Sequence, residues 1–342
     1  MATVTIKDMA KKLGVSPATV SLALNGRHGV NETTRKMVLD LAEKWNYHGT
    51  IAKKAPTKQG TINFLIYRRA GRILTNTQFF ARLIEAVEKA ARQHRYALTI
   101  TYCDGQAQLA DSLAAAAASH CLGVLMLGTE MGQDDIPFLE ASPVPVVVLD
   151  CNLLGASFDM VSINNMDGVW RAMQYLHDRG VTDIGYLRSS FPIVNFTSRY
   201  IGYTYSLQEF GQTLSADKVF ELDPTVDGAQ RDIETLLASG RKLPEALLAD
   251  NDLIAIGAIR GLLQAGYRVP EDVSIIGFDN IPLSTYAEPP LTSVEVSCHD
   301  LGARAVEVLL WRIAHPEAIA QQVSISTKLV VRSSVREPEK HV

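Results

Sequence analysis

From residue 61 onward, short apolar runs of strand length alternate with segments that have the periodicity of a helix. The run TINFLI covers 61–66, and Phe80, Leu83, Ile84 and Val87 then recur at helical spacing. The next apolar runs are ALTITY, LGVLML and VPVVVL. Continuous apolar strands that alternate with helices predict a parallel sheet with helices on both faces, because such strands are buried on both sides.

The same alternation begins again after about residue 165. The runs IGYLR, KVFEL, ALLA and VSIIG are separated by segments with helical character near 166–180, 196–211, 227–240 and 252–266. A chain of 342 residues is also too long for one small core. The sequence therefore predicts two doubly wound α/β units in series, each with its own core.

Polar residues follow many of the predicted strands, at their carboxyl ends. Open parallel sheets bind ligands at this edge, so we expect a cleft between the two units. Any one of these positions is more often a helix cap or a loop residue than a ligand contact, but their convergence on one edge favours a ligand site. The positions are 67–80, Asp150, 195–199, Asp223, Asn251 with Asp252, and Asp279 with Asn280.

The first 48 residues contain signals for three short helices. Thr5 and Asp8 have the spacing of a capping box, and Gly14 suits the end of the first helix. Ser16 followed by Pro17 is a second helix start. A third helix is predicted from near Asn31, with apolar residues on one face.

Two helices joined by a short turn that contains glycine are typical of a helix-turn-helix. The second helix of this motif lies in the major groove of DNA and presents its N-terminal side chains to the bases. A three-helix bundle without a DNA role is the alternative. Small hydroxyl side chains in place of Lys/Glu pairs on the outer face favour DNA binding. The residues at the N-terminal end of the second predicted helix are Ser16, Pro17, Ala18, Thr19, Ser21 and Leu22.

The charge distribution is uneven along the chain. Residues 1–60 contain ten of the 33 Lys/Arg residues and four of the 37 Asp/Glu residues. The remainder of the chain therefore has 23 basic and 33 acidic residues. A basic N-terminal region on an acidic body is typical of a polyanion-binding module attached to a domain of another kind.

VTIKDMAKKLGVSPATVSLALNG and VNETTRKMVLDLAEKWNY resemble the DNA-binding domain of the LacI/GalR family of repressors. NNMDG, SRYIGY, the segment 248–280 and PPLTSV resemble the sensor domain of that family, which is similar to periplasmic sugar-binding proteins. The resemblance implies an all-α helix-turn-helix head and an α/β periplasmic-binding-protein-like sensor of two doubly wound parallel-sheet subdomains.

The resemblance also implies roles for residues of the head. Phosphate contacts or docking would fall to Ser16, Thr19, Ser21 and Asn25, base reading to Pro17, Ala18 and Leu22, and anchoring of the flanking backbone to Thr5, Val30 and Thr34. The family commonly has Arg where this chain has Leu22, and that Arg reads guanine. We therefore expect an operator that differs from the family's common one at that base pair.

The expected hinge, residues 49–60, also departs from the family pattern. Gly49 stands where the family has Pro, and Ala55 or Pro56 stands at the position of the Leu that wedges into the minor groove. Lys53 and Lys54, like Lys58, can still neutralise phosphates. We expect weaker kinking of the operator than is usual for the family, unless Ile51 serves as the wedge.

The resemblance to the family also implies ligand contacts in the sensor domain. It places Asp150, Arg199, Asn251 and Asp279 as polar contacts and Phe79 and Phe80 as an apolar or stacking wall. A guanidinium and a carboxylate suit the paired hydroxyls of a sugar or oligosaccharide, with a purine or another metabolite as the alternative. The loop 67–77 is expected to cover the cleft, to reach a dimer partner, or to be a surface turn.

The expected domain limits are a helix-turn-helix domain at 1–48, the hinge at 49–60, and a sensor and dimerisation domain at 61–342. The sensor divides into one subdomain of about 61–163 with 293–323 and another of about 164–292 with 324–342. The chain would cross between them near 163–165, 292–294 and 322–326.

These features predict a ligand-responsive repressor of transcription that binds a pseudo-palindromic operator on double-stranded DNA as a homodimer. Release of DNA by an inducing sugar is the commoner behaviour in the family, and tightening by a corepressor, a purine or another metabolite, is the alternative. The tail SSVREPEKHV has no heptad repeat, which favours a dimer over a tetramer. Without GxSxG, GxGxxG after the first strand, or a His cluster, we expect no enzyme. The four scattered cysteines favour neither metal nor cofactor. Without a signal peptide or a long apolar segment, we expect a cytoplasmic protein with no membrane partner rather than a periplasmic receptor.

Overall fold

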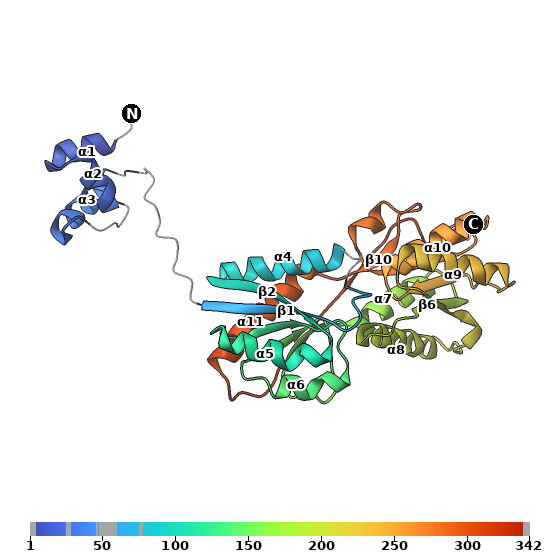
Figure 1. The fold of residues 1–342 in the computed structure, drawn as a ribbon. Coiled ribbons are helices and arrows are strands. Elements are labelled where there is room, and N and C mark those ends of the chain that lie inside the picture. Colours follow the sequence, from blue (N-terminus) through green and yellow to red (C-terminus); the bar gives the residue numbers. More distant parts are fainter. Residues whose placement is uncertain (1–4, 25–28, 46, 48–59, 75–77, 338–342) are drawn as a thin grey trace. The chain divides into compact units, whose positions relative to one another are not determined.

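The structure, a computed structural model, describes residues 5–24, 29–45, 47, 60–74 and 78–337. The chain divides into two compact units, Met1–Gln59 and Gly60–Val342 (Figure 1). Of the predicted hinge 49–60, only Gly60 lies among the described residues, so the departures at Gly49 and Pro56 fall outside them.

The first unit contains the helices α1 (Ile6–Leu13), α2 (Pro17–Leu24) and α3 (Glu32–Lys44). The predicted capping box is present, with Thr5 and Asp8 each bonding the other's backbone N–H. Gly14 ends α1 in the left-handed conformation, at φ 66°, which a side chain with a Cβ disfavours. Met9, Val20 and Val38, one from each helix, are fully buried where the three helices meet.

The first sheet of the second unit has the order β11-β5-β4-β3-β1-β2, and all its strands are parallel. Its helices lie on both faces because alternate strand residues point to opposite sides. Phe64 packs with residues of α4 and α11 on one face, and Leu65 packs with residues of α5 on the other. The elements are β1 (Gly60–Arg68), α4 (Gln78–Gln93), β2 (Tyr96–Asp104), η1 (Gln106–Gln108), α5 (Leu109–Ala118), β3 (Val124–Leu127), η2 (Gln133–Asp135), α6 (Ile136–Glu140), β4 (Val146–Leu149), β5 (Asp159–Ile163), α11 (Cys298–Ala314) and β11 (Gln322–Ile325).

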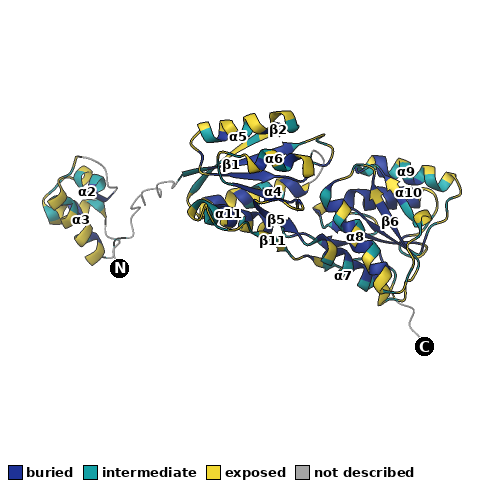
Figure 2. Cartoon of the chain, turned by 90° about the horizontal axis from the view of Figure 1, so that it is seen from below, coloured by how far each residue is buried: buried dark blue, intermediate teal, exposed yellow. Residues whose placement is uncertain are grey.

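The second sheet has the order β12-β10-β9-β8-β6-β7, parallel except for the antiparallel edge strand β12. Tyr186 packs on the side of α7 and α8, whereas Leu187 packs on the side of α9 and α10. Figure 2 shows that the inner strands of both sheets are buried and that many exposed residues lie on the helices, whereas the edge strands β2, β11 and β12 are largely intermediate or exposed. The elements are α7 (Asn165–His177), β6 (Ile184–Ser189), α8 (Val194–Glu209), η3 (Ala216–Lys218), β7 (Val219–Leu222), α9 (Val226–Ala238), β8 (Ala246–Ala249), α10 (Asp252–Gln264), β9 (Ser274–Asp279), η4 (Pro282–Thr285), β10 (Thr292–Glu295) and β12 (Lys328–Val330).

The chain passes between the sheets three times. It leaves the first sheet after β5, returns between β10 and α11, and crosses again between β11 and β12. Residues 293–295, which the sequence placed with the first subdomain, lie in the second sheet because β10 pairs with β9. The return therefore follows Glu295, slightly later than the expected 292–294.

Apolar runs alone did not identify β5, β10, β11 and β12, which are three to five residues long and contain polar residues. Within the described part of the chain, no helix is long and apolar enough to cross a membrane.

Candidate functional site: a pocket between the two sheets

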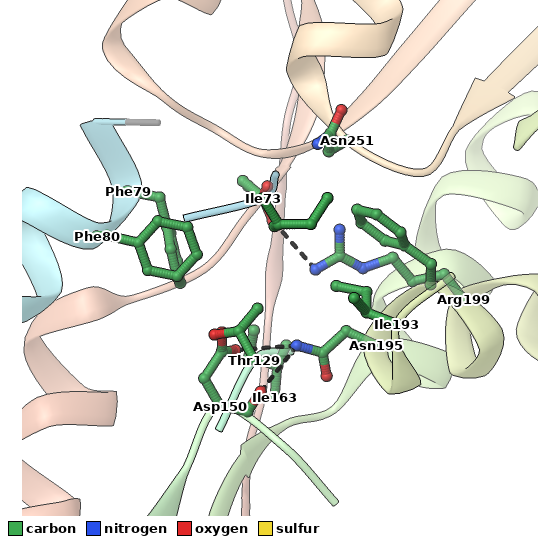
Figure 3. Close-up of a pocket in the computed structure, with 12 residues that line it drawn as sticks. Ile73, Phe79, Phe80, Thr129, Asp150, Ile163, Ile193, Asn195, Arg199 and Asn251 are labelled. Atoms are coloured by element: carbon green, nitrogen blue, oxygen red, sulfur yellow. Dashed lines mark hydrogen bonds and ion pairs between the residues drawn. The ribbon is translucent and has the colours of Figure 1, made fainter. Parts of the chain in front are cut away.

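A pocket with about 320 Å³ of empty space lies where the carboxyl ends of the two sheets face each other (Figure 3). All six residues expected to contact a ligand line it. Six of its lining residues are apolar and six are polar, a mixture that both holds and orients a small molecule. The residues are Ile73, Phe79, Phe80, Thr129, Asp150, Ile163, Ile193, Asn195, Phe196, Arg199, Asn251 and Asp279.

Arg199 is a buried cation in the wall of the pocket, with 3% of its surface exposed. It lies on α8, and its guanidinium packs over the ring of Phe278 at 3.7 Å. Its Nε donates to Asn165 at 2.8 Å, Nη1 donates to the backbone oxygen of Asp250, and Nη2 donates to Asp279 at 3.1 Å. These bonds use three of the five N–H donors and hold the guanidinium in place, so two remain for another partner.

Asp150 follows β4 and stands opposite Arg199, on the other subdomain. Its carboxylate accepts hydrogen bonds from Thr129 at 2.6 Å and from the Nδ2 of Asn195 at 3.1 Å. Burial raises the pKa of Asp150 to about 7, and these hydrogen bonds oppose that rise only in part. The group therefore changes charge near neutral pH.

A chain of hydrogen bonds joins these two residues across the pocket. Asn195 donates to the backbone oxygen of Asp150 at 3.0 Å and to its carboxylate, and it accepts from Asn165 at 2.9 Å. Asn165 in turn accepts from Arg199. Asn195 and Arg199 lie four residues apart on one face of α8, which is why a single helix supplies both links. Because Asn195 belongs to the second subdomain and Asp150 to the first, the chain spans the cleft.

Asp279 and Asn251 complete the polar lining. Asp279 ends β9 with a φ of 101°, and burial raises the pKa of its carboxyl although Arg199 lowers it. Asn251 caps α10 through its Oδ1, which accepts from the backbone N–H of Ile254 at 3.0 Å. Its Nδ2, like the Oδ2 of Asp279, has no hydrogen-bond partner among the described residues. Asn251 therefore combines the helix-cap role with a place in the pocket.

The apolar wall comes from α4 and the loop before it. Phe79 and Phe80 stand edge to face, with ring centroids 5.2 Å apart. Ile73, from the predicted loop 67–77, is 6% exposed and lies beside them. Among the described residues 67–74 of this loop, Ile73 lines the pocket.

Three of the polar positions after strands do not line the pocket. Asp223 accepts hydrogen bonds from the backbone and hydroxyl of Thr225, and Asp252 accepts from Ser284 and Ser293. Asn280 accepts from Arg332 at 2.8 Å. These three side chains therefore form hydrogen bonds within the fold, as expected for helix-cap or loop residues.

Several lining residues were not among the residues expected to contact a ligand. Thr129 lies two residues after β3, so the rule that located Asp150 would also have found it. Asn195 lies in the stretch 195–199 that followed a predicted strand, but only Arg199 was selected from it. Ile73, Ile163, Ile193 and Phe196 are apolar and have no sequence pattern that separates them from core residues.

In the first unit, the residues expected at DNA form one end of α2 and its surroundings. Ser16, Pro17 and Ala18 are exposed, and Thr19, Ser21 and Leu22 are half-buried. The Ser16 hydroxyl caps α2 by accepting from the N–H of Thr19 at 3.0 Å.

The other residues expected at DNA lie outside α2. Thr5 is engaged in the cap of α1, Val30 packs against the core of the head, and Thr34 lies in the first turn of α3. Asn25, Lys53 and Lys54 lie outside the described residues.

Comparison with known proteins gives the same two-part organisation. The model for bacterial regulatory proteins of the lacI family matches residues 5–49, and the model for a periplasmic binding protein-like domain matches residues 173–335. The HTH-type transcriptional repressor PurR of Mannheimia succiniciproducens is 32% identical over 338 residues, which are 97% of this chain and 98% of that protein. PurR of Pasteurella multocida is 31% identical over 336 residues, with the same shares covered.

Two solved structures have the same fold over nearly the full chain. The transcriptional regulator CelR in complex with cellobiose is 26% identical, with a TM-score of 0.72 over 97% of this chain and 99% of that one. The lac repressor dimer bound to its operator and an anti-inducer is 24% identical, with a TM-score of 0.73 over the same shares, a likeness of fold. Because the identity to the PurR proteins exceeds 30% over almost the whole of both chains, the protein belongs to the LacI family of bacterial regulatory proteins.

Proposed function

We propose that this protein is a transcriptional repressor that binds a pseudo-palindromic operator as a homodimer and responds to a small molecule in the pocket between its two sheets. The observation that carries the proposal is the convergence of Asp150, Arg199, Asn251 and Asp279 on one pocket, in a chain whose first unit is a helix-turn-helix. The matched proteins of the family are named as regulators of transcription rather than as enzymes. The PurR relatives are named as transcriptional repressors, which supports the assignment to repression.

We propose a sugar as the effector. Arg199 has two N–H donors beyond its protein contacts and Asn251 has an amide donor, while Asp279 and Asp150 offer carboxylate oxygens. A sugar hydroxyl donates one hydrogen bond and accepts others, so neighbouring hydroxyls match such alternating donors and acceptors. The rings of Phe79 and Phe80 supply an apolar surface for one face of a ring.

A purine is the second candidate, and one finding favours it. Relatives that cover nearly the whole chain are named PurR. The pocket's aromatic wall suits a flat base as well as a sugar ring, and its donors and acceptors suit the edge of a base. In this case we expect a corepressor, whose binding tightens the complex with the operator.

Calorimetric titration with hexoses, disaccharides, nucleobases and nucleosides distinguishes the two candidates. We expect a sugar to bind, and Asp279→Asn to weaken it about 10-fold or more because a charged acceptor is lost. Asp272→Asn is the matched control, since Asp272 also pairs with an arginine, Arg268, but on the surface of the chain. Binding of a nucleobase and of no sugar would replace the sugar by the purine, and binding of neither class would contradict both.

A further inference from the structure

The loop that carries Ile73 into the pocket is folded around one buried carboxylate. Glu130 is 3% exposed and lies three residues after β3. Its Oε2 accepts hydrogen bonds from the backbone N–H groups of Arg69, Ala70 and Gly71, each at 2.9 Å. Its Oε1 accepts from the N–H of Ile73, also at 2.9 Å. We call residues 69–73 the anchored loop.

Four backbone N–H groups that converge on one anion form a nest, and its hydrogen bonds are stronger than neutral ones because the acceptor is charged. Only a carboxylate fits this arrangement well. An ionised carboxylate is purely an acceptor, whereas the amide of a glutamine would present N–H donors to other donors. The anchored loop therefore depends on the chemical identity of Glu130.

A second set of contacts holds the beginning of the same loop. Arg69 forms ion pairs with Asp134 at 2.8 Å and with the fully buried Asp135 at 2.7 Å. The hydroxyl of Tyr67 donates to Asp135 at 3.1 Å. The loop is thus tied at both ends to the segment that follows β3.

The neighbour of Glu130 is part of the pocket itself. Thr129 donates to Asp150 on the polar side of the pocket, while Glu130 holds the loop that places Ile73 on the apolar side. Two adjacent residues therefore position opposite sides of one small pocket. Ile73 is one of the twelve residues that line this small pocket, so a displacement of its side chain would change the size of ligand that fits.

We propose that Glu130 is a positioning residue for effector binding, which folds the anchored loop into a fixed wall and, through Ile73, limits the size of the ligand that the pocket admits. The limit on ligand size rests on the proposed function, whereas the anchoring of the loop by Glu130 does not.

Two measurements on the full chain test the proposal. The first is hydrogen exchange of the backbone amides of residues 69–71 and 73 without ligand, in wild type and in Glu130→Gln. We expect exchange at least 10-fold faster in the variant, with the exchange of the β1 core unchanged. The matched control is Glu140→Gln, since Glu140 also accepts from a backbone N–H and a hydroxyl, those of Ser157, but away from the loop. Equal exchange in Glu130→Gln and wild type would overturn the anchoring.

The second measurement compares the affinities of a smaller and a larger member of whichever ligand class binds the wild type, a hexose with a disaccharide or a nucleobase with its nucleoside. We expect Glu130→Gln and Ile73→Ala each to shift the ratio of the two affinities at least 5-fold toward the larger ligand, whereas general destabilisation would weaken both ligands equally. An unchanged ratio in a variant whose loop exchanges fast would refute the positioning role. If wild type binds no member of the panel, the proposed function fails, and loop exchange alone then decides whether Glu130 anchors the loop.

Discussion

Leu22 is the residue of the helix-turn-helix at which we expect base recognition to differ from that of an arginine. Leu22 lies on α2 and is half-buried. Its Cδ1 lies near Gly29, 3.9 Å from the position that a Cβ on that residue would take. A leucine donates no hydrogen bond, so it can contact a thymine methyl group but cannot read guanine as an arginine does. We therefore expect the operator of this protein to differ from one read by arginine at that base pair.

The corresponding prediction concerns Leu22→Arg. We expect the variant to gain a preference for guanine at one symmetric position of the half-site, worth about 1–3 kcal/mol, because arginine bonds guanine at two atoms. Selection from a randomised DNA library, carried out with both proteins, measures this. Identical base preferences would show that residue 22 does not contact the bases.

A second prediction for a single residue concerns Asp150 and the pH dependence of effector binding. Burial raises its pKa to about 7, so it is mostly protonated at pH 6 and mostly ionised at pH 8. If its carboxylate accepts a hydrogen bond from the effector, the affinity should rise about 10-fold between pH 6 and pH 8. In Asp150→Asn this rise should disappear. A calorimetric affinity of the wild type that is flat over this range would exclude an ionised Asp150 as an acceptor.

At the scale of elements, helix caps were the features that sequence reasoning located best. The capping box of Thr5 and Asp8 and the start of α2 at Ser16 and Pro17 depend on residues one to three positions apart, so the pattern is complete in the local sequence. The strands of both sheets with strong apolar runs were found for a similar reason. The short strands β11 and β12 are defined mainly by pairing with distant strands, which no local pattern records.

The residues in and around the pocket likewise divide into those that the local sequence predicts and those that only the fold brings together. Asp150 and Asp279 follow buried strands, and this position points to the carboxyl edge of a sheet. The contacts of Glu130 with the anchored loop join residues 57 to 61 positions apart. A lone glutamate after a strand has no feature that separates it from a surface residue until the fold brings the loop to it.

The cap of α1 gives a prediction for one element. Thr5→Ala removes the hydroxyl that bonds the N–H of Asp8, so α1 should lose about 1 kcal/mol of stability. Hydrogen exchange of the α1 amides in the full chain measures the loss. Thr33→Ala, an exposed threonine in the first turn of α3, should leave this exchange unchanged. Equal exchange in the two variants would mean that the capping box adds no stability.

At the scale of the whole sensor unit, buried carboxyls make stability depend on pH. Burial raises the pKa of Asp252 to about 7 and that of Asp250 to about 6. The folded chain therefore keeps protons that the unfolded chain releases near pH 4, and the free energy of unfolding falls as pH rises from about 4 to 7. Asp252 alone should account for a loss of about 2 kcal/mol between pH 5 and pH 8.

Urea unfolding at pH 5 and pH 8 checks this. The wild type should lose more stability over this range than Asp252→Asn, whose amide does not ionise. A loss of the same size in both proteins would show that Asp252 keeps an ordinary pKa in the folded chain.

At the scale of the whole molecule, we expect occupation of the pocket between the sheets to alter binding of DNA by the helix-turn-helix. Coupling between the two sites requires the effector to favour one state of the protein over another, and such coupling changes affinities about 5- to 150-fold. The most direct measurement is the Kd of the full chain for its selected operator with and without saturating effector. We predict a change of at least 5-fold that is lost in Asp279→Asn at the same effector concentration. An operator Kd that stays the same when calorimetry shows the pocket to be filled would contradict the account.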